Sequence, residues 1–303
     1  MEPFGFLVVD KPQGMTSHDV VNVVRRGIGV KRIGHAGTLD PMATGVLILC
    51  IGLATRLSEY VMSERKSYTA TIRLGIETDT YDADGETVAV AETSHLSAPD
   101  IERALLRFQG DVEQVPPMYS AIKQGGKKLY KLARQGKEVE RAPRNVWMAT
   151  HLLDLNLPTL SISITCSAGT YIRSIAHDLG AILGVGAHLT ALRRTASTVT
   201  LDEAVPWQTL IDAMNAGNWQ RYLVSELRLM AHIAMLKLNE AHTQDMLHGR
   251  FIPSAELAIE SPHDGDLRRG YDPAGRFIGI MGLYGDHWKP IKIFNPESSA
   301  LTE

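Results

Sequence analysis

The apolar run Val46–Ile51 constrains the fold of this chain more than any other stretch of its sequence. An uninterrupted apolar run predicts a strand that is buried on both faces, because a half-exposed strand would alternate apolar and polar side chains. A glycine-rich loop that begins at Gly34 leads into this run and contains Asp40 just before Pro41. We therefore expect one carboxylate on a rigid turn beside an apolar wall.

The sequence around Asp40 leaves two roles open for its carboxylate. Aspartate before proline is ordinary turn chemistry, in which the side chain accepts hydrogen bonds from nearby N–H groups. Proline also pushes the residue before it towards an extended conformation, and glycines let a ligand approach the backbone. His35 and Thr38 crowd the same loop. This is more polar chemistry than a turn requires, so a functional carboxylate is favoured.

The stretch GHAGTLDPMATGVL, from Gly34 to Leu47, resembles the active-site signature of the TruB family, the bacterial tRNA pseudouridine-55 synthases. The signature is long and irregular, and other matching segments cover nearly the whole chain. The resemblance implies that Asp40 is the catalytic nucleophile, and that His35 fills the space left when the target nucleotide swings out. It also implies an α+β pseudouridine synthase fold, with a mixed, largely antiparallel central sheet flanked by helices and loops.

Length and composition agree with one large domain and a small one. The chain has 303 residues, of which 44% are hydrophobic, and this is enough to build both. Cys50 and Cys166 lie in apolar runs without metal-type spacing, so we expect buried, reduced thiols in a cytoplasmic protein. No signal peptide is recognised, because the apolar run Phe4–Val9 is short and meets charged residues at once. No stretch approaches the roughly 20 apolar residues that a membrane helix needs.

The sequence pattern changes in the last quarter of the chain, where a short helical segment is followed by short strands separated by turn signals. It resembles a PUA-type small β-barrel, which is a common RNA-binding domain. We therefore place a pseudouridine synthase catalytic domain at residues 1–230 and a PUA-like domain at residues 231–303. The histidines of this region, His232, His242 and His248, lack the close pairing of a zinc site, so we expect them at the surface.

Charge is distributed unevenly, although the net charge is only −3. A generic nucleic-acid binder usually carries a basic surface, and this chain as a whole does not. Residues 77–113 hold ten acidic and two basic side chains, whereas residues 116–144 hold eight basic and two acidic ones. The basic segment fits a solvated helix face and a grip on a phosphate backbone equally well. It resembles the RNA-gripping thumb insertion of the family, here about residues 115–145. The lysines that this resemblance places on RNA are Lys123, Lys127 and Lys128.

The segment Ser67–Leu74 alternates, so its apolar residues share one face of a strand. Tyr68 lies on that face, where a tyrosine is most simply a core residue with a satisfied hydroxyl. The segment also resembles the family motif whose tyrosine packs against the target base. The acid-rich stretch Thr78–Glu86 lacks the closing glutamate and flanking helices of a calcium loop. The resemblance places its Asp82 near the active site.

A helix is expected from about Thr170, which can act as its N-cap, and Arg173 falls in the first turn. A cation there opposes the helix dipole at a cost of about 0.3–1 kcal/mol, which suggests a carboxylate partner. A surface arginine in water explains the position equally well. The segment resembles the family motif whose arginine pairs with the catalytic aspartate, which implies that Arg173 keeps Asp40 ionised and oriented. The same resemblance places Tyr171 and Leu192 at the pocket for the base.

Three functions remain open. The resemblance implies that a cytoplasmic enzyme, typically a monomer, converts the uridine at position 55 in the T loop of tRNA to pseudouridine. Moving the ribose bond from N1 to C5 of the base involves no redox change, and the sequence shows no Walker, dinucleotide or clustered metal-ligand motif, so no cofactor and no metal are expected. The first alternative is an RNA-binding or tRNA-folding module with incidental or no isomerase activity. The second is a guide-RNA-directed relative, but such relatives tend to carry a lysine-rich tail and this chain ends SSALTE, so no guide RNA is expected.

Overall fold

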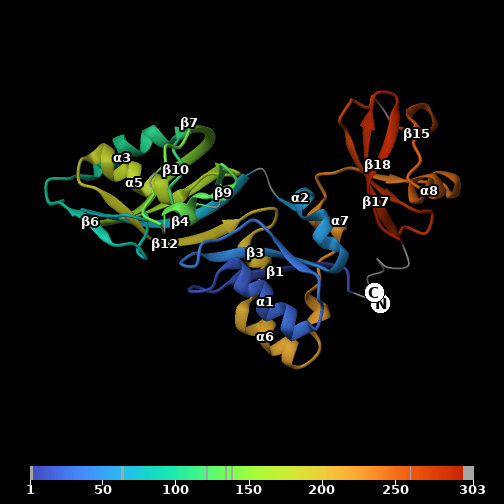
Figure 1. Cartoon of the computed structure of the whole chain (residues 1–303), viewed down its shortest axis with the longest axis horizontal. Helices are drawn as coiled ribbons and strands as arrows, with labels where there is room; N and C mark the ends of the chain where they lie inside the picture. Colours follow the sequence, from blue (N-terminus) through green and yellow to red (C-terminus); the bar gives the residue numbers. More distant parts are fainter. Residues whose placement is uncertain are drawn as a thin grey trace.

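The computed structural model describes most of the chain, namely residues 3–62, 65–120, 122–133, 135–137, 139–259 and 261–295. Within these residues the chain forms a nine-stranded mixed sheet with helices and loops around it, and a separate five-stranded sheet near the C-terminus (Figure 1). The expected α+β class is therefore confirmed.

The large sheet is mostly antiparallel, as expected. Its strands are β1 (Gly5–Lys11), β2 (Ile33–Ala36), β3 (Thr44–Ile51), β4 (Arg65–Leu74), β7 (Gly110–Gln114), β10 (Arg144–Asn156), β11 (Thr159–Ser167), β12 (Ala187–Ala196) and β13 (Val205–Pro206). They follow the order β13-β1-β3-β12-β4-β11-β10-β7, and β2 pairs with β3 beside this path. Among the described residues, the parallel neighbours in this sheet are β1 with β13 and β3 with β12.

The central strand β3 is buried on both faces, as its apolar run predicted. Leu47 and Leu49 belong to one hydrophobic core, whereas Ile48 and Cys50, which alternate with them, belong to another. In Figure 1, α1 and α6 lie below β1 and β3, whereas the C-terminal strands lie above and to the right of them. The helices that contribute buried residues to the first core are α1 (Ser17–Ile28), α3 (Ala98–Leu105), α5 (Ile172–Leu183) and α6 (Trp207–Asn215).

The remaining elements are short. The helices are α2 (Ser58–Val61), α4 (Leu129–Ala133), α7 (Glu226–Leu229) and α8 (Glu240–Leu247), and the 3-10 helices are η1 (Gly52–Leu57), η2 (Leu106–Phe108), η3 (Leu201–Glu203), η4 (Trp219–Tyr222) and η5 (Ser254–Glu256). Two hairpins stand outside the large sheets, β5 (Ile76–Thr78) with β6 (Thr87–Val90) and β8 (Lys123–Gln124) with β9 (Lys127–Lys128).

The C-terminal sheet shares a core with the large one. Its strands are β14 (Met235–Lys237), β15 (Ile252–Pro253), β16 (Leu267–Tyr271), β17 (Phe277–Tyr284) and β18 (His287–Ile293), in the order β14-β16-β17-β18-β15. Phe277 and Phe294 pack on Phe4, with ring centroids 6.3 and 5.5 Å apart, in the core that also contains Ile48. Arg56 adds a hydrogen bond to the Ile293 carbonyl at 2.7 Å. The two sheets are therefore joined by apolar burial.

Local sequence signals account well for α1. Thr16 accepts a hydrogen bond from the Asp19 N–H, and the Asp19 side chain accepts one from the Thr16 N–H, which completes a capping box. Gly29 ends the helix in the left-handed conformation that glycine adopts without strain. The sequence predicts this helix through about Ile28, with Thr16 or Ser17 as its cap and Gly29 as its stop, and the structure confirms it.

Several local expectations need correction. Gly34 and His35 lie in the short strand β2, paired with β3, and not in a loop. The sequence predicts one helix over 54–62, but the structure has a 3-10 helix followed by a single α-helical turn. His242 is buried and hydrogen-bonds to Glu256, because α8 packs against the C-terminal sheet and encloses it. The apolar periodicity of α5 also predicts Ile182 on its inner face, but Ile182 is 49% exposed because it lies in the last turn.

Cys50 and Cys166 are free and buried, as expected. Burial raises the pKa of the Cys50 thiol to about 12 and that of Cys166 to about 11. Both thiols are therefore neutral at physiological pH. Among the described residues, no helix combines the length and the apolar character that crossing a lipid bilayer requires.

The close approach of β3 to β12 predicts a large effect of Gly45→Ala. Gly45 has φ +99°, and a Cβ there would lie 2.2 Å from the carbonyl oxygen of Arg194. Strain of about 1–2 kcal/mol from the left-handed backbone and about 1–3 kcal/mol from overpacking should together lower the free energy of unfolding by about 2–5 kcal/mol. Denaturant titration measures this loss.

Gly29→Ala is the matched control for this comparison. Gly29 also has positive φ, at +70°, but a Cβ there would meet no atom within 4 Å. Only the backbone strain of about 1–2 kcal/mol is then expected. Equal losses in the two variants would contradict the steric argument.

Candidate active site

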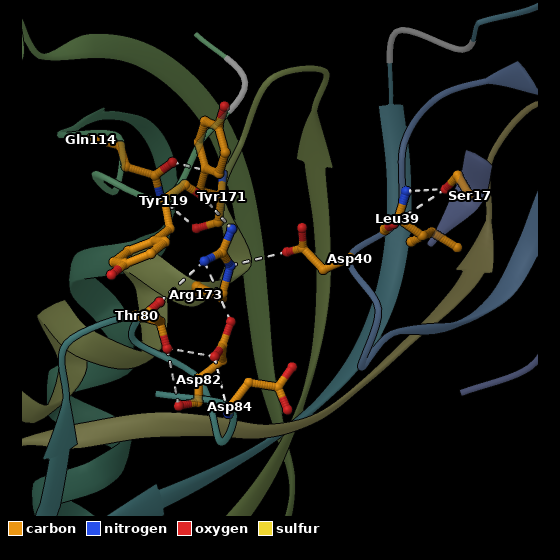
Figure 2. A network of polar contacts seen from close by, with 10 residues as sticks. All are labelled: Ser17, Leu39, Asp40, Thr80, Asp82, Asp84, Gln114, Tyr119, Tyr171 and Arg173. Atoms are coloured by element: carbon orange, nitrogen blue, oxygen red, sulfur yellow. Dashed lines mark hydrogen bonds and ion pairs between the residues drawn. The ribbon is translucent and has the colours of Figure 1, made fainter. Parts of the chain in front are cut away.

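The turn that carries Asp40 is fixed by Ser17, the first residue of α1. Ser17 Oγ accepts a hydrogen bond from the Leu39 N–H at 2.8 Å and lies 3.2 Å from the Leu39 carbonyl, to which it donates (Figure 2). The Ala43 N–H donates to the Asp40 carbonyl at 3.1 Å. The backbone on both sides of Asp40 is therefore held, while the Asp40 side chain remains 38% exposed and can reach a ligand.

The carboxylate of Asp40 meets the guanidinium of Arg173, so the ion pair expected between them is present. Arg173 Nε lies 3.0 Å from Asp40 Oδ2 (Figure 2), and Arg173 is only 6% exposed. Among the described residues, the Nε hydrogen has no hydrogen-bond partner. The contact is therefore an attraction between charges that lacks the alignment of a hydrogen bond.

Arg173 is shared with the acidic loop 78–86. Its Nη1 lies 3.4 Å from Asp82 Oδ2 and donates to the Thr80 carbonyl at 3.1 Å, and its Nη2 donates to the Tyr119 carbonyl at 2.9 Å. A buried arginine is tolerated only when such partners replace water. The guanidinium therefore joins the Asp40 turn, the acidic loop and the start of the basic insertion.

Asp82 is 6% exposed and is held by its own loop. Thr80 Oγ1 donates to Asp82 Oδ1 at 2.6 Å, and the Asp84 N–H donates to the same oxygen at 3.2 Å. The loop also bonds to β12, where the Ala83 N–H donates to the Leu189 carbonyl at 2.9 Å. These contacts direct the second oxygen of Asp82 towards Arg173, so the guanidinium that pairs with Asp40 also pairs with Asp82.

The start of α5 is fixed by Gln114 of β7 and not by Thr170, so the predicted cap is wrong. The helix begins at Ile172, and Thr170 lies too early in the chain to cap it. Instead, Gln114 Oε1 accepts from the Tyr171 N–H at 2.8 Å, and Gln114 Nε2 donates to the Tyr171 carbonyl at 3.0 Å (Figure 2). The half-buried Tyr171 and the adjoining Arg173 are thus positioned by a residue that sequence analysis did not single out.

Tyr68 and Leu192 line one apolar face formed by neighbouring strands. Tyr68 on β4 is 8% exposed and Leu192 on β12 is 7% exposed, and both belong to the same core as Leu39. The strand register pairs Tyr68 with Arg194, two residues beyond Leu192, so the two side chains are diagonal neighbours. Burial raises the pKa of the Tyr68 hydroxyl, which keeps that hydroxyl protonated at neutral pH.

Arg194 is a buried site residue that sequence analysis missed. It is 1% exposed, and its guanidinium donates to the carbonyls of Val46, Thr38 and Gly37 at 2.7, 3.4 and 3.2 Å. The guanidinium also contacts the Tyr68 hydroxyl. Strand alternation could have found it, because Leu192 on the inward face puts the residue two positions later on that face too.

Lys11 is a second missed residue. It is fully buried at the end of β1, and its Nζ donates to the carbonyls of Pro12 at 2.8 Å and Pro41 at 3.4 Å. Burial lowers the pKa of the Lys11 ammonium to about 8, although the nearby charge of Asp40 opposes this shift. The ammonium therefore holds the carbonyl that follows Asp40. A lysine before a proline gave no sequence signal for this burial.

The remaining predicted site residues fall in two groups. His35 lies on β2, half-buried, and its Nδ1 is buried with no hydrogen-bond partner among the described residues. Burial, with a smaller effect from the charge of Arg194, lowers the pKa of His35, so its imidazole is neutral at pH 7. The other group consists of lysines whose backbone forms the hairpin β8–β9, but whose side chains lie outside the described part of the structure: Lys123, Lys127 and Lys128.

A cavity of about 240 Å³ lies between the acidic loop and the basic insertion. It is open to solvent and adjoins the loop whose Thr80 carbonyl binds Arg173. The lining side chains include Asp79, Tyr81, Met118, Tyr119 and Arg141.

Solved structures share this fold. A chain of the complex described as "Crystal Structure of a Cbf5-Nop10-Gar1 Complex" superposes with a TM-score of 0.75 at 24% identity, over 98% of this chain and 88% of that chain. A chain from "Structure of H/ACA RNP bound to a substrate RNA containing 2'-deoxyuridine" superposes with a TM-score of 0.74 at 22% identity, over 97% and 86%. At these identities the likeness establishes the fold, which is that of the pseudouridine synthases.

Sequence comparison defines the family. Residues 25–172 match the "TruB family pseudouridylate synthase (N terminal domain)", and residues 173–234 match the "tRNA pseudouridylate synthase B C-terminal domain". The chain belongs to the TruB family of pseudouridylate synthases, which are isomerases.

Curated relatives agree with this assignment, one of them over nearly the full length. The tRNA pseudouridine synthase B of Pseudomonas paraeruginosa is 44% identical over 287 residues, which cover 93% of this chain and 92% of the relative. That of Symbiobacterium thermophilum is 56% identical over 197 residues, which cover 64% of this chain and 66% of the relative.

The contacts of Arg194 predict that Arg194→Met is strongly destabilising. The substitution removes a buried cation and leaves carbonyl oxygens without donors, so we expect the free energy of unfolding to fall by about 2–5 kcal/mol. Arg107 is the control, because it is exposed in η2. Arg107→Met should change the free energy of unfolding by less than about 0.5 kcal/mol. Denaturant titration measures the free energy of unfolding of both variants. Equal decreases would contradict a stabilising role for the buried Arg194.

Proposed function

We propose that this chain converts a uridine of tRNA to pseudouridine, with Asp40 as the nucleophile. The observation that carries the proposal is the Asp40 carboxylate, partly exposed and held 3.0 Å from the buried guanidinium of Arg173. The names of the relatives, tRNA pseudouridine synthase B, support tRNA as the substrate. The position we propose is uridine 55 in the T loop.

The reaction requires a nucleophile and a pocket that excludes water. The bond from ribose C1′ to N1 of uracil breaks, the base turns, and a bond from C1′ to C5 forms. The proton of C5 is lost and N1 gains one, so atoms balance without an oxidant or reductant. A carboxylate is a competent nucleophile at a sugar or base carbon. Asp40 supplies this group from a turn that Ser17 and Lys11 hold in place.

Arg173 keeps the nucleophile ionised and oriented. A guanidinium beside a carboxylate favours the charged carboxylate and offsets the cost of partial burial. Asp82 and the Thr80 carbonyl fix the guanidinium from the opposite side. Arg173 therefore acts on Asp40 and takes no part in bond making.

The target base must leave its stack to reach Asp40. Extrusion of a nucleotide costs a few kcal/mol, and least in a loop that is already partly open. Tyr68, Tyr171 and Leu192 supply the apolar surface on which the extruded base would pack, and His35 fills the vacated position in the RNA. The lowered pKa of His35 suits a neutral ring that stacks on bases.

The rest of the RNA is held by two further regions in this proposal. The basic insertion, with Lys123, Lys127 and Lys128, grips the phosphate backbone, since its excess of lysine and arginine offers an electrostatic footprint. Residues 231–303 form a PUA-like RNA-binding domain beside the catalytic domain of residues 1–230. The chain acts in the cytoplasm as a monomer and without a guide RNA.

Asp40→Asn tests the nucleophile. Amide nitrogen cannot replace the carboxylate charge, so we expect the single-turnover rate on unmodified tRNA transcript to fall by roughly 10⁴-fold or more. Tritium release from C5-labelled uridine in a T-arm minihelix measures the rate, and mapping of the transcript locates the modified uridine. Asp154→Asn, at an exposed position of β10, should leave the rate unchanged.

Three outcomes would contradict the proposal. A purified wild-type chain that binds tRNA but releases no tritium would favour the RNA-binding module, and an Asp40→Asn variant at full rate would remove Asp40 as nucleophile. Activity that needs an added guide RNA would contradict the stand-alone enzyme.

Arg173→Lys tests the orienting role. Lysine keeps a positive charge but cannot contact Asp40, Asp82 and the backbone carbonyls together. We expect the single-turnover rate to fall about 10–100-fold, with tRNA affinity within about twofold of the wild type. The rate should be measured from pH 5 to pH 8, because a loss of orientation lowers it at every pH. Wild-type rates across this range would disprove the role.

A further inference from the structure

The imidazole of His177 lies on the same face of α5 as Arg173, one helical turn later. His177 Nε2 is 3.2 Å from Glu77 Oε1, and its Nδ1 is 3.1 Å from Asp178 Oδ1. Its ring also stacks on Tyr81, with centroids 3.9 Å apart and planes inclined by 28°. The mechanism above assigns no role to this cluster.

The neighbours of His177 favour its positively charged form. A carboxylate can only accept a hydrogen bond, and a neutral imidazole donates from one nitrogen alone. Nδ1 is within hydrogen-bond distance of Asp178, and the carboxylate of Glu77 lies near Nε2, so the two negative charges favour the imidazolium over the neutral ring. The face of the Tyr81 ring stabilises a cation as well. The hydrogen bond and charge of Asp178, and then the charge of Glu77, raise the pKa of His177, although burial opposes this shift.

His177 stacks on Tyr81, which lies in the acidic loop between the two residues that bind Arg173. Tyr81 has φ +66°, which is strained for a residue with a Cβ. It lies between Thr80, whose carbonyl binds Arg173, and Asp82, whose carboxylate pairs with Arg173. Such a conformation persists only when surrounding contacts impose it.

We propose that His177 is a positioning residue: its charged ring clamps Tyr81 and Glu77 to α5, and so holds Thr80 and Asp82 against Arg173. The inference rests on the proposed function, since Arg173 acts there on Asp40. Helix α5 then supplies both the Arg173 guanidinium and the His177 ring that holds the loop carrying its partners.

The clamp has a defined dependence on pH. The groups that face the imidazole are Glu77 from β5, Asp178 from α5 and Tyr81 from the loop, while His188 of β12 bonds to the Ile76 carbonyl beside Glu77. Because the pKa of His177 is raised, the clamp is complete below about pH 6.5 and is lost as pH rises through the raised pKa. Catalysis should weaken over that same interval.

Three variants test the clamp on the full-length protein. His177→Ala removes it, and we expect the single-turnover rate at pH 7 to fall about tenfold, with tRNA affinity within about twofold. His177→Arg keeps a planar cation at every pH, so it should restore the rate at pH 7 and abolish the decline above it. His151→Ala, at an exposed site of β10, is the control and should match the wild type.

A second measurement does not depend on isomerase activity. Hydrogen exchange of the Tyr81 and Ala83 amides, which donate to Thr78 and Leu189, should be about tenfold faster in His177→Ala than in the wild type at pH 6.5. Equal exchange in the two proteins, or an unchanged rate and pH profile in His177→Ala, would overturn the inference. A His177→Arg variant as slow as His177→Ala would also overturn it. If the wild type itself fails to isomerise tRNA, the proposed function fails, while the exchange data still judge the clamp.

Discussion

The structure depends on one buried cation placed between two carboxylates. Arg173 pairs with Asp40 at 3.0 Å and with Asp82 at 3.4 Å. Removing an arginine from water is expensive unless charges and carbonyls replace the lost hydration. The chain meets this requirement by bringing together segments from three distant parts of the sequence. The contacts that allow Arg173 to be buried therefore also place Asp40 and Asp82 around its guanidinium.

Sequence analysis recovered the parts of this arrangement that follow local rules. The apolar run of β3 predicted burial on both faces, and Thr16 and Gly29 predicted the ends of α1. A cation in the first turn of α5 opposes the helix dipole, which correctly suggested a carboxylate partner for Arg173. The identity of that partner as Asp40 came from family resemblance, because residues so far apart in sequence leave no local signal of contact.

The parts that sequence analysis missed depend on backbone groups and on register. Arg194 and Lys11 are buried because carbonyl oxygens from other segments receive their hydrogen bonds, and no side-chain pattern encodes a carbonyl. Gln114 holds the start of α5 from a neighbouring strand, so Thr170 was a plausible cap only while β7 was unknown. Even so, the inward position of Arg194 follows from strand alternation, and that signal was available.

The double burial of β3 has a consequence for the architecture of the chain. Its alternate side chains face two different cores, and Phe277 and Phe294 from the C-terminal end complete one of them. A shortened protein that ended near Leu229 would lose the two phenylalanine rings that pack in the same core as Ile48, Cys50 and Phe6. Apolar area on that face of the sheet would then be exposed, and this favours self-association. The C-terminal sheet therefore covers one face of β3, the strand that follows the Asp40 turn.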